Sequence, residues 1–305
     1  MPISNSAAYR GRFAPSPTGT LHAGSMLAAL GSWLLARQAK GQWLLRIEDL
    51  DPPREIAGAA AGQLQALTSF GLQHDGEVVS QSQRGHLYRA ALDRLIASGL
   101  AFECHCSRAE LAVAGGIHRR CVAASRRPDP AIRLRVVDDC EIGFDDLVHG
   151  RVNQRMDRDI GDFVLLRTDG LWAYQLAVVV DDAAQAITDV VRGADLLDST
   201  PRQILLQRAL GLPTPNYAHL PLLLDTDGRK LSKSDAALPV DTGNPLPTLH
   251  ALWRCLGQAP LASASLLTPV GFLDCALHAF QPDLIPRAAV PASAAVHNTA
   301  ATSRD

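Results

Sequence analysis

The chain has 305 residues, of which 47% are hydrophobic and 20% are charged, and its formal net charge is −2. With a sequence pI of about 6.5 and a mean hydropathy of +0.03, it fits neither a disordered chain nor a protein that coats nucleic acid non-specifically. It shows no apolar signal segment and no uncharged apolar run long enough to cross a bilayer, which predicts a cytoplasmic protein.

The first part of the chain has the pattern of an α/β domain. A short strand ends where the prolines and the glycine of "PSPTG" forbid regular structure, and apolar residues then recur at helical spacing as far as Ala39. We predict strands at 9–14, 43–50 and about 100–103, and helices at 21–39, from 51, and at about 83–98. This alternation predicts a Rossmann-type, doubly wound parallel sheet.

The rest of the chain is less regular. Cysteine, arginine, proline and aspartate are dense between about 104 and 160, which predicts an insertion. Beyond it we predict a hairpin at 169–170, helices from 174 and at 201–211, strands at 186–192 and 219–224, and short helices at 245–280. The predicted division is 1–103 and 161–243 for two halves of the sheet domain, 104–160 for the insertion, 244–287 for a C-terminal helical region, and 288–305 for a disordered tail.

Residues 12–25, "RFAPSPTGTLHAGS", place a Pro/Gly loop between a strand and the start of a helix. Free backbone N–H groups and the helix dipole meet anions in this geometry. Gly19 and Gly24 let the backbone approach a ligand closely, and His22 can donate to a phosphate oxygen. The loop alone is equally compatible with a βα turn that carries a surface histidine, and it is not a P-loop.

Residues 230–235, "KLSKSD", are compatible with a solvated basic loop when taken alone. With "PSPTGTLHAGS", about two hundred residues earlier, they resemble the two signature motifs of class I aminoacyl-tRNA synthetases in the form that glutamyl-tRNA synthetases use. Leu231 replaces the usual methionine of the second motif. The resemblance implies a class I catalytic core with an ATP site formed by His22, Gly24, Lys230, Ser232 and Lys233, of which His22 and Lys233 are the catalytic residues.

The reaction that this resemblance implies is attack of a carboxylate on the α-phosphorus of ATP, whose transition state needs pre-placed cations. Mg²⁺ is expected with the nucleotide. A glutamate substrate needs a cation for its side-chain carboxylate and an acceptor for its ammonium group. Taken singly, a surface ion pair explains Arg192 equally well, and a buried tyrosine explains Tyr174 better. By resemblance, the glutamate site consists of Arg12, Phe13, Ala14, Pro15, Ser16, Glu48, Tyr174 and Arg192.

Four candidate metal ligands, Cys104, Cys106, His118 and Cys121, fall within eighteen residues. They suit tetrahedral zinc that stabilises a core-poor insertion, although reduced cysteines beside an exposed histidine are the alternative. The cysteine spacing resembles that of the glutamyl-Q tRNA(Asp) synthetase family, short paralogues of glutamyl-tRNA synthetases, and this favours one structural zinc ion. His118 stands where that family usually has tyrosine, and the gap to Cys121 is one residue shorter.

Chain length separates the two families that the motifs resemble. The last predicted helix ends near Phe280, which leaves too few residues for the anticodon-binding domain of a full glutamyl-tRNA synthetase. The resemblance to the shorter family covers most of residues 9–285. It implies tRNA-independent activation of L-glutamate and transfer of glutamate to the queuosine base in the anticodon loop of tRNA(Asp). A truncated glutamyl-tRNA synthetase that charges tRNA(Glu), or a non-catalytic paralogue, is the alternative.

Arginines cluster around the insertion and are compatible with an RNA-backbone contact. They are Arg119, Arg120, Arg126, Arg127, Arg133 and Arg135. A solvated loop, balanced by nearby aspartates, has equal weight. The expected partners are therefore L-glutamate, ATP and tRNA(Asp), without a membrane.

Overall fold

A seven-stranded sheet is the central feature of the computed structural model. The structure describes residues 8–113, 115–225, 227–229, 231, 239–261 and 267–292. The strands of the sheet are β1 (Arg10–Phe13), β2 (Gln42–Ile47), β3 (Val79–Ser80), β6 (Glu141–Asp146), β7 (Gly150–Arg155), β9 (Asp189–Gly193) and β10 (Asn216–Leu220). Their order is β3-β2-β1-β9-β10-β6-β7, and neighbours are parallel except β6 and β7. This confirms the predicted doubly wound sheet, whose order reverses between β1 and β9, the place where such sheets bind ligands.

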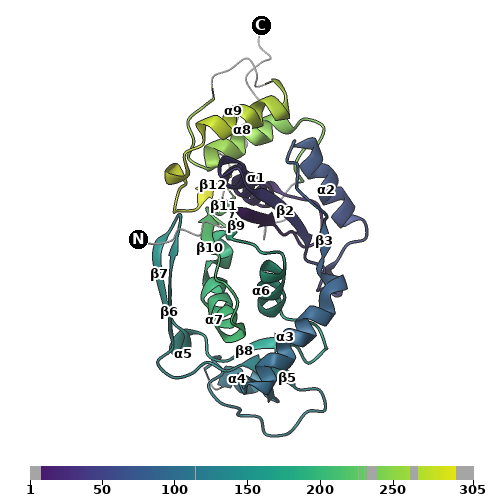
Figure 1. Cartoon of the computed structure of the whole chain (residues 1–305), viewed down its shortest axis with the longest axis vertical. Helices are drawn as coiled ribbons and strands as arrows, with labels where there is room; N and C mark the ends of the chain where they lie inside the picture. The colour runs from purple at the N-terminus through teal and green to yellow at the C-terminus, as the bar shows by residue number, and fades with distance from the viewer. Residues whose placement is uncertain are drawn as a thin grey trace.

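Helices cover both faces of this sheet (Figure 1). Neighbouring residues of one strand face opposite cores, since side chains alternate along a strand. Val190 and Tyr217 pack in the core that contains residues of α3, α6 and α7, whereas Val191 and Ala218 pack in the core that contains residues of α1, α8 and α9. The helices are α1 (Ala23–Gln38), α2 (Ala59–Ser69), α3 (Gly85–Ala97), α4 (Arg108–Val113), α5 (Met156–Asp159), α6 (Tyr174–Ala184), α7 (Thr200–Leu210), α8 (Pro245–Cys255) and α9 (Pro269–Ala279).

Helix α1 is apolar on most of its sides because it lies between the sheet and the C-terminal helices α8 and α9. Met26, Leu30 and Leu34 on this helix have no exposed surface. Contacts with the sheet on one side and with α8 and α9 on the other therefore fix the position of α1, whose first residues belong to the first motif. Within the part of the chain that the structure describes, no helix has both the length and the apolar character needed to span a bilayer.

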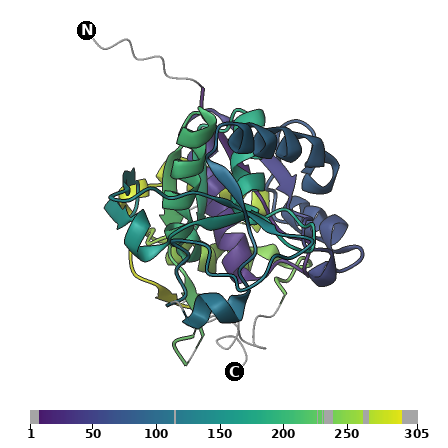
Figure 2. The same cartoon turned by 90° about the horizontal axis from the view of Figure 1, so that it is seen from below.

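A smaller sheet forms a lobe at one end of the molecule. Strands β4 (Ala101–Cys104), β5 (Ala131–Leu134) and β8 (Phe163–Leu166) pair antiparallel in it. With α4 they form the small lobe, which lies at the lower end of Figure 1 and faces the viewer in Figure 2. The structure thus contains the irregular region that the sequence predicted, but with different limits.

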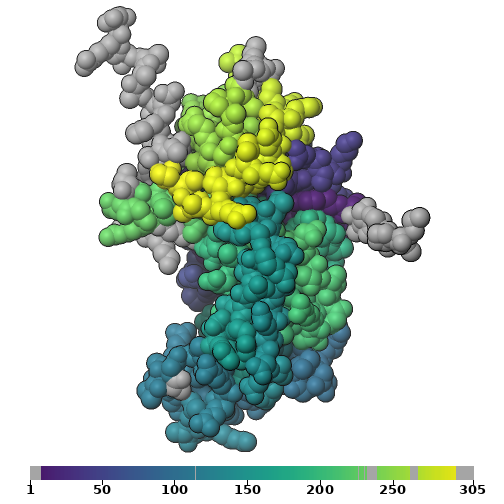
Figure 3. Space-filling model, turned by 90° about the vertical axis from the view of Figure 1, so that its left-hand side faces the viewer, coloured from purple at the N-terminus to yellow at the C-terminus, as the bar shows by residue number. Residues whose placement is uncertain are grey.

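The stretch 104–160, predicted as one insertion, is divided between the two sheets. Its β6–β7 hairpin extends the main sheet beside β10, and the teal segment that contains it runs along one side of the molecule in Figure 3. Conversely, β8 falls in the range assigned to the second half of the main domain but pairs with β5 in the small lobe. Alternation along a strand indicates that it is half-buried, but not which strand it pairs with.

The helix predicted to start at "DPPRE" begins later than expected. Its prolines form a separate 3₁₀ turn, η1 (Pro52–Arg54), and α2 begins at Ala59 after Gly58 in a left-handed conformation with φ 80°. Proline suits a first turn, but here that turn is not continued. The predicted start of this helix at residue 51 was therefore wrong, because a 3₁₀ turn and a glycine precede the helix that begins at Ala59.

The predicted disordered tail starts with an ordered strand. Residues 288–292 include β12 (Val290–Pro291), which pairs in parallel with β11 (Leu223–Leu224). The backbone N–H of Ala292 also donates to the carbonyl of Leu224. Backbone pairing orders this segment although its composition is typical of a mobile tail. Residues 293–305 of the predicted tail lie outside the described residues.

We expect Gly257→Ala to destabilise the C-terminal helical region more than Gly99→Ala. Both glycines have left-handed φ values, 75° and 72°, so each substitution carries the same backbone strain, about 1–2 kcal/mol. A Cβ at Gly257 would also lie 2.1 Å from the backbone oxygen of Leu284, whereas a Cβ at Gly99 meets open space. Urea unfolding should give an additional loss of about 1–3 kcal/mol for Gly257→Ala. Equal losses would contradict the close contact between Gly257, at the end of α8, and the backbone of Leu284.

Candidate active site and metal centre

The first motif forms the loop between β1 and α1. His22 is the N-cap residue of α1: its Nδ1 accepts from the backbone N–H of Ser25 at 3.3 Å. A Cβ at Gly24 would lie 3.1 Å from the His22 ring, so the ring needs the glycine beside it. The loop is held from outside, because Gln63 Nε2 donates to the carbonyls of Ser16 and Gly19 at 2.9 and 2.7 Å. This arrangement presents the positive end of a buried helix at the switch point of the sheet.

One residue of the second motif and two residues that follow it contact the region of the first motif or the core beneath it. Leu231 packs against the core that contains α1. After the second motif, Pro239 forms an antiparallel bridge with His22, and the N–H of Val240 donates to Leu21 O at 3.1 Å. Lys230, Ser232 and Lys233 themselves lie outside the described residues. The chain that follows the second motif therefore lies against the residues just before α1, about two hundred positions away in the sequence.

Arg12, at the end of β1, belongs to a buried chain of charges. Its Nε donates to Asp182 Oδ1 at 3.2 Å, and Nη1 of Arg46 donates to the same oxygen at 2.8 Å. Nη2 of Arg46 then donates to Glu48 Oε1 at 3.2 Å. Arg12, Asp182 and Arg46 are 3%, 6% and 0% exposed. One carboxylate on α6 thus holds the arginines of two neighbouring strands and, through Arg46, the carboxylate of Glu48.

The pKa values of these carboxyl groups diverge. Burial raises the pKa of Asp182, but Arg12 and Arg46 outweigh it, so that this pKa is lowered. Burial prevails at Glu48, whose pKa is raised despite Arg46 and Arg12. Arg46 remains charged, since the carboxylates raise its pKa although burial alone lowers it. Glu48 is therefore the carboxylate that gains most from a further cation, which a substrate ammonium group can supply.

Asp181, next to Asp182, anchors the same helix on its other side. It accepts from Gln81 Nε2 and from the hydroxyl of Tyr88, each at 2.7 Å, and it pairs with Arg84. These partners lie in and beside α3. Asp182 therefore links α6 to the arginines of β1 and β2, and Asp181 links the same helix to α3 and the turn before it.

Tyr174 and Arg192 meet opposite this chain of charges. Arg192 Nη1 donates to the Tyr174 hydroxyl at 3.3 Å. Burial raises the pKa of Tyr174, and the charges of Arg192, Glu48 and Arg12 all act on it. Arg192 is itself 5% exposed, so its charge is poorly screened. The structure thus brings together four predicted glutamate-site residues from separate parts of the chain: Arg12, Glu48, Tyr174 and Arg192.

The remaining predicted glutamate-site residues have different places. The ring of Phe13 is buried and stacks on Trp43, with ring centroids 6.1 Å apart, so its side chain belongs to the core. Pro15 is buried and accepts a backbone bond from Glu48 at 2.9 Å. Ala14 is half-buried and Ser16 is exposed. None of these four side chains carries a charge, and their place in the glutamate site stays a prediction.

Several residues of the site had not been identified from the sequence. They are Arg46, Asp146, Asp181, Asp182, Thr200 and His219, all of which are buried. A signal was present for some of them: an arginine in the apolar strand "WLLRI", and adjacent aspartates that follow "VVV" in a helix, both require buried partners. The identity of those partners depends on the fold.

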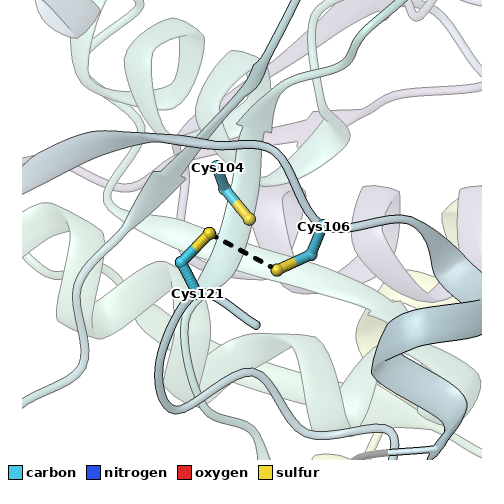
Figure 4. A group of neighbouring side chains, drawn as sticks. All are labelled: Cys104, Cys106 and Cys121. Carbon is cyan, nitrogen blue, oxygen red and sulfur yellow. Dashed lines mark hydrogen bonds between the residues drawn. The ribbon is translucent and has the colours of Figure 1, made fainter. Parts of the chain in front are cut away.

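Three cysteine sulfurs converge at the end of β4. The Sγ atoms of Cys104, Cys106 and Cys121 all lie within 4.8 Å of one another, and they point toward a common centre in Figure 4. The Sγ atoms of Cys106 and Cys121 are 3.6 Å apart, close to the separation of about 3.8 Å that tetrahedral zinc imposes on two thiolates. Backbone N–H groups, chiefly that of Ala123, lower the pKa of Cys121, which favours a thiolate there.

His118 lies beside this cysteine group and is 2% exposed. Its Nε2 is 3.2 Å from Cys104 Sγ, although the mutually close set of ligand atoms consists of the cysteines alone. Its Nδ1 bonds to Asp162 Oδ2 at 2.8 Å. A carboxylate that holds the far nitrogen of a histidine is typical of metal-binding histidines. The donor set therefore fits a thiolate-rich metal site with a histidine at its edge.

Comparison with known proteins agrees with this geometry. The family model described as tRNA synthetases class I (E and Q), catalytic domain, matches residues 8–128 and 117–244. The fold and the paired motifs thus define a class I aminoacyl-tRNA synthetase, a ligase. The glutamyl-Q tRNA(Asp) synthetase of Xanthomonas oryzae pv. oryzae (strain KACC10331 / KXO85) is 62% identical over 284 residues, 92% of this chain and 94% of that protein. The chain belongs to the family of glutamyl-Q tRNA(Asp) synthetases.

Of two further comparisons, the first supports the family and the second supports the fold. The glutamyl-Q tRNA(Asp) synthetase of Pseudomonas entomophila (strain L48) is 50% identical over 285 residues, 93% of this chain and 96% of that protein. The crystal structure of a glutamate tRNA ligase from Elizabethkingia meningosepticum CCUG26117, in complex with its amino acid, has a TM-score of 0.78 and 26% identity. It matches 95% of this chain and 68% of that one.

We expect Asp182→Asn to lower the free energy of unfolding by about 3–5 kcal/mol, because it leaves two buried arginines without their shared anion. Asp169→Asn is the matched control: it removes the same charge from the exposed Arg167–Asp169 pair, whose side chains are 43% and 47% exposed. Denaturant unfolding should separate the two variants clearly. A loss for Asp182→Asn no larger than that of the control would contradict the role given to this carboxylate.

Proposed function

We propose that this enzyme activates L-glutamate with ATP, without needing tRNA, and transfers the glutamate to the queuosine base in the anticodon loop of tRNA(Asp). Membership of the glutamyl-Q tRNA(Asp) synthetase family supports this proposal. The observation that carries it is the convergence of Arg12, Glu48, Tyr174 and Arg192 beside the loop of the first motif.

The four side chains suit glutamate in particular. Arg12 and Arg192 supply cations for a carboxylate, and the Tyr174 hydroxyl adds a polar group. Glu48, whose pKa is raised by burial, gains an ionic partner when an ammonium group binds. A substrate with a neutral amide in place of the side-chain carboxylate would leave the buried Arg192, which has no carboxylate partner among the described residues, without an anion, so glutamine should be rejected strongly.

The activation step follows from the same arrangement. The bound α-carboxylate attacks the α-phosphorus of ATP, and pyrophosphate leaves. His22 and the start of α1 contact the nucleotide phosphates, while Lys230, Ser232 and above all Lys233 stabilise the charge of the transition state. Mg²⁺ bound with ATP would neutralise further charge on the phosphates. The bridge between His22 and Pro239 supports a shared nucleotide site for the two motifs.

An assay with ATP, labelled glutamate, and tRNA(Asp) with or without queuosine tests the proposal. We expect glutamate-dependent ATP–pyrophosphate exchange without tRNA, and stable label only on the queuosine-containing tRNA. Lys233→Gln should reduce exchange by at least about 100-fold, since it removes a charge that stabilises the transition state, whereas Lys40→Gln, at an exposed position, should not. Label on tRNA(Glu) would favour the truncated-synthetase alternative, and absence of exchange would favour a non-catalytic paralogue.

We also propose that the three cysteines, with His118, hold one structural zinc ion. The close sulfurs and the Asp162–His118 contact support it. The ion would cross-link the start of the small lobe to the segment that returns toward β5, and it takes no part in the chemical step.

Elemental analysis tests the zinc proposal. We expect one zinc per chain in the wild-type protein and loss of at least most of it in Cys104→Ser, together with a lower melting temperature. Cys275→Ser is the control, since Cys275 lies on α9 outside the cysteine group. Equal metal content in both variants, or no metal in the wild-type protein, would refute the site.

A further inference from the structure

Arg192 is held by a buried relay that reaches it from the β6–β7 hairpin. Its Nε donates to His219 Nε2 at 3.1 Å. On the other edge of the ring, His219 Nδ1 lies 2.6 Å from Asp146 Oδ2. Asp146 and His219 are 4% and 0% exposed, so water does not compete for these bonds. Neither residue lies in the motifs that define the family resemblance.

The hydrogen-bond partners fix which ring nitrogen carries the proton. Arg192 Nε always bears a hydrogen, so His219 Nε2 has to be the acceptor. The proton then sits on Nδ1, where the carboxylate of Asp146 accepts it. Burial lowers the pKa of His219 below its ordinary value, which favours this neutral ring. The hydroxyl of Thr200 also lies 3.1 Å from this Nε2, but it donates to the carbonyl of Leu196, so the tautomer follows from Arg192 and Asp146.

The guanidinium of Arg192 is thereby fixed on several sides. Besides His219 it contacts the Thr200 hydroxyl through Nη2 at 2.8 Å and the Tyr174 hydroxyl through Nη1. The His219 ring also stacks against Tyr217, with centroids 6.2 Å apart. A guanidinium binds a carboxylate well only when the plane of the guanidinium is oriented so that two of its N–H groups point at the two carboxylate oxygens. Among these contacts, the bond from Nε is made to His219, which Asp146 holds in turn.

We propose that Asp146 and His219 are positioning residues for glutamate: the carboxylate sets the tautomer of His219, and His219 sets the orientation of Arg192 for the substrate carboxylate. This inference rests on the proposed function, in which Arg192 binds glutamate. It also gives the β6–β7 hairpin, which the sequence placed in a separate insertion, a direct part in substrate selection.

Asp146→Asn is a sharp test because the geometry dictates how the asparagine sits. Oδ1 of Asp146 accepts from the backbone N–H groups of Val148 and His149 at 3.0 and 2.9 Å, so the amide oxygen must occupy that place. The NH₂ group then faces His219 Nδ1 and forces the proton onto Nε2. Two N–H groups, those of His219 and Arg192, would point at each other, and Arg192 would turn away.

Asp145→Asn is the matched control. It removes the same charge one residue earlier on β6, where the side chain is 80% exposed and, within the part of the chain that the structure describes, pairs with the solvent-exposed Arg151. His219→Phe is a second test variant: it keeps an aromatic ring against Tyr217, removes the acceptor of Arg192, and leaves the hairpin bonds of Asp146 Oδ1 in place. It keeps the proposal testable if Asp146→Asn folds poorly.

Glutamate-dependent ATP–pyrophosphate exchange should show a raised KM for glutamate in Asp146→Asn and His219→Phe, by about 10- to 100-fold, the range for loss of a hydrogen bond to a charged group. The KM for ATP should stay within about twofold in both variants, since Arg192 does not contact the nucleotide in this proposal. Asp145→Asn should leave both constants unchanged. A lower melting temperature with an unchanged KM for glutamate would show a purely structural role and overturn the proposal.

Nitrogen NMR of histidine-labelled protein provides a readout that is independent of activity. The His219 signals, assigned by their loss in His219→Phe, should show the proton on Nδ1 in the wild-type protein and in Asp145→Asn, and on Nε2 in Asp146→Asn. A wild-type proton on Nε2 would overturn the relay. If the wild-type protein shows no glutamate-dependent exchange, the proposed function fails, and the tautomer measurement alone then decides whether the relay exists.

Discussion

The pairing of buried arginines with buried carboxylates is the interaction on which the architecture of this enzyme depends. Arg46 has no exposed surface, and an unpaired charge in such a place costs several kcal/mol. Its partners Glu48 and Asp182 come from the end of β2 and from α6. These ion pairs therefore fix the position of α6 on the sheet. The same carboxylate of Asp182 also holds Arg12.

The two arginines of the proposed glutamate site are thus held by buried partners in the absence of a substrate. Arg12 is fixed by a residue 170 positions away, and Arg192 is fixed through His219 by one 73 positions before that histidine. If Arg12 and Arg192 bind glutamate as proposed, the substrate does not have to order these side chains, and less of its binding energy is lost to entropy. Rigid cations also favour discrimination, since they cannot relax around a neutral analogue.

Local patterns predicted the parts of this molecule that depend on local physics. Parallel strands buried on both faces read as apolar runs, and the loop after β1 reads as an anion site, because these properties depend on neighbouring residues. The cysteine group was found in the same way, since Cys104 and Cys106 are close in sequence. Tyr174 and Arg192 were predicted as site residues through resemblance to a family and not through their spacing, and the structure shows that their side chains contact each other.

The features that were missed depend on long-range pairing. Periodicity is weak between about 104 and 160, so neither the strands β6 and β7 nor the place of β6 beside β10 was predicted, and Asp146 was assigned to the insertion. Phe13 was placed in the substrate site because its neighbours belong there, whereas strand alternation turns its ring toward Trp43. The ordered strand β12 was hidden by a composition typical of a tail. In each case the partner strand or side chain, and not the local propensity, decides the outcome.

The course of the β6–β7 hairpin has a consequence for the evolution of this fold. The small lobe has the appearance of a module, yet the chain leaves it after β5, contributes two strands to the main sheet, and returns to it for β8. A single deletion or exchange of the intervening stretch would also take Asp146 away from the active site. An exchange of the small lobe between related proteins therefore has to keep the β6–β7 hairpin. For this reason we expect the lobe and the main sheet to be inherited together.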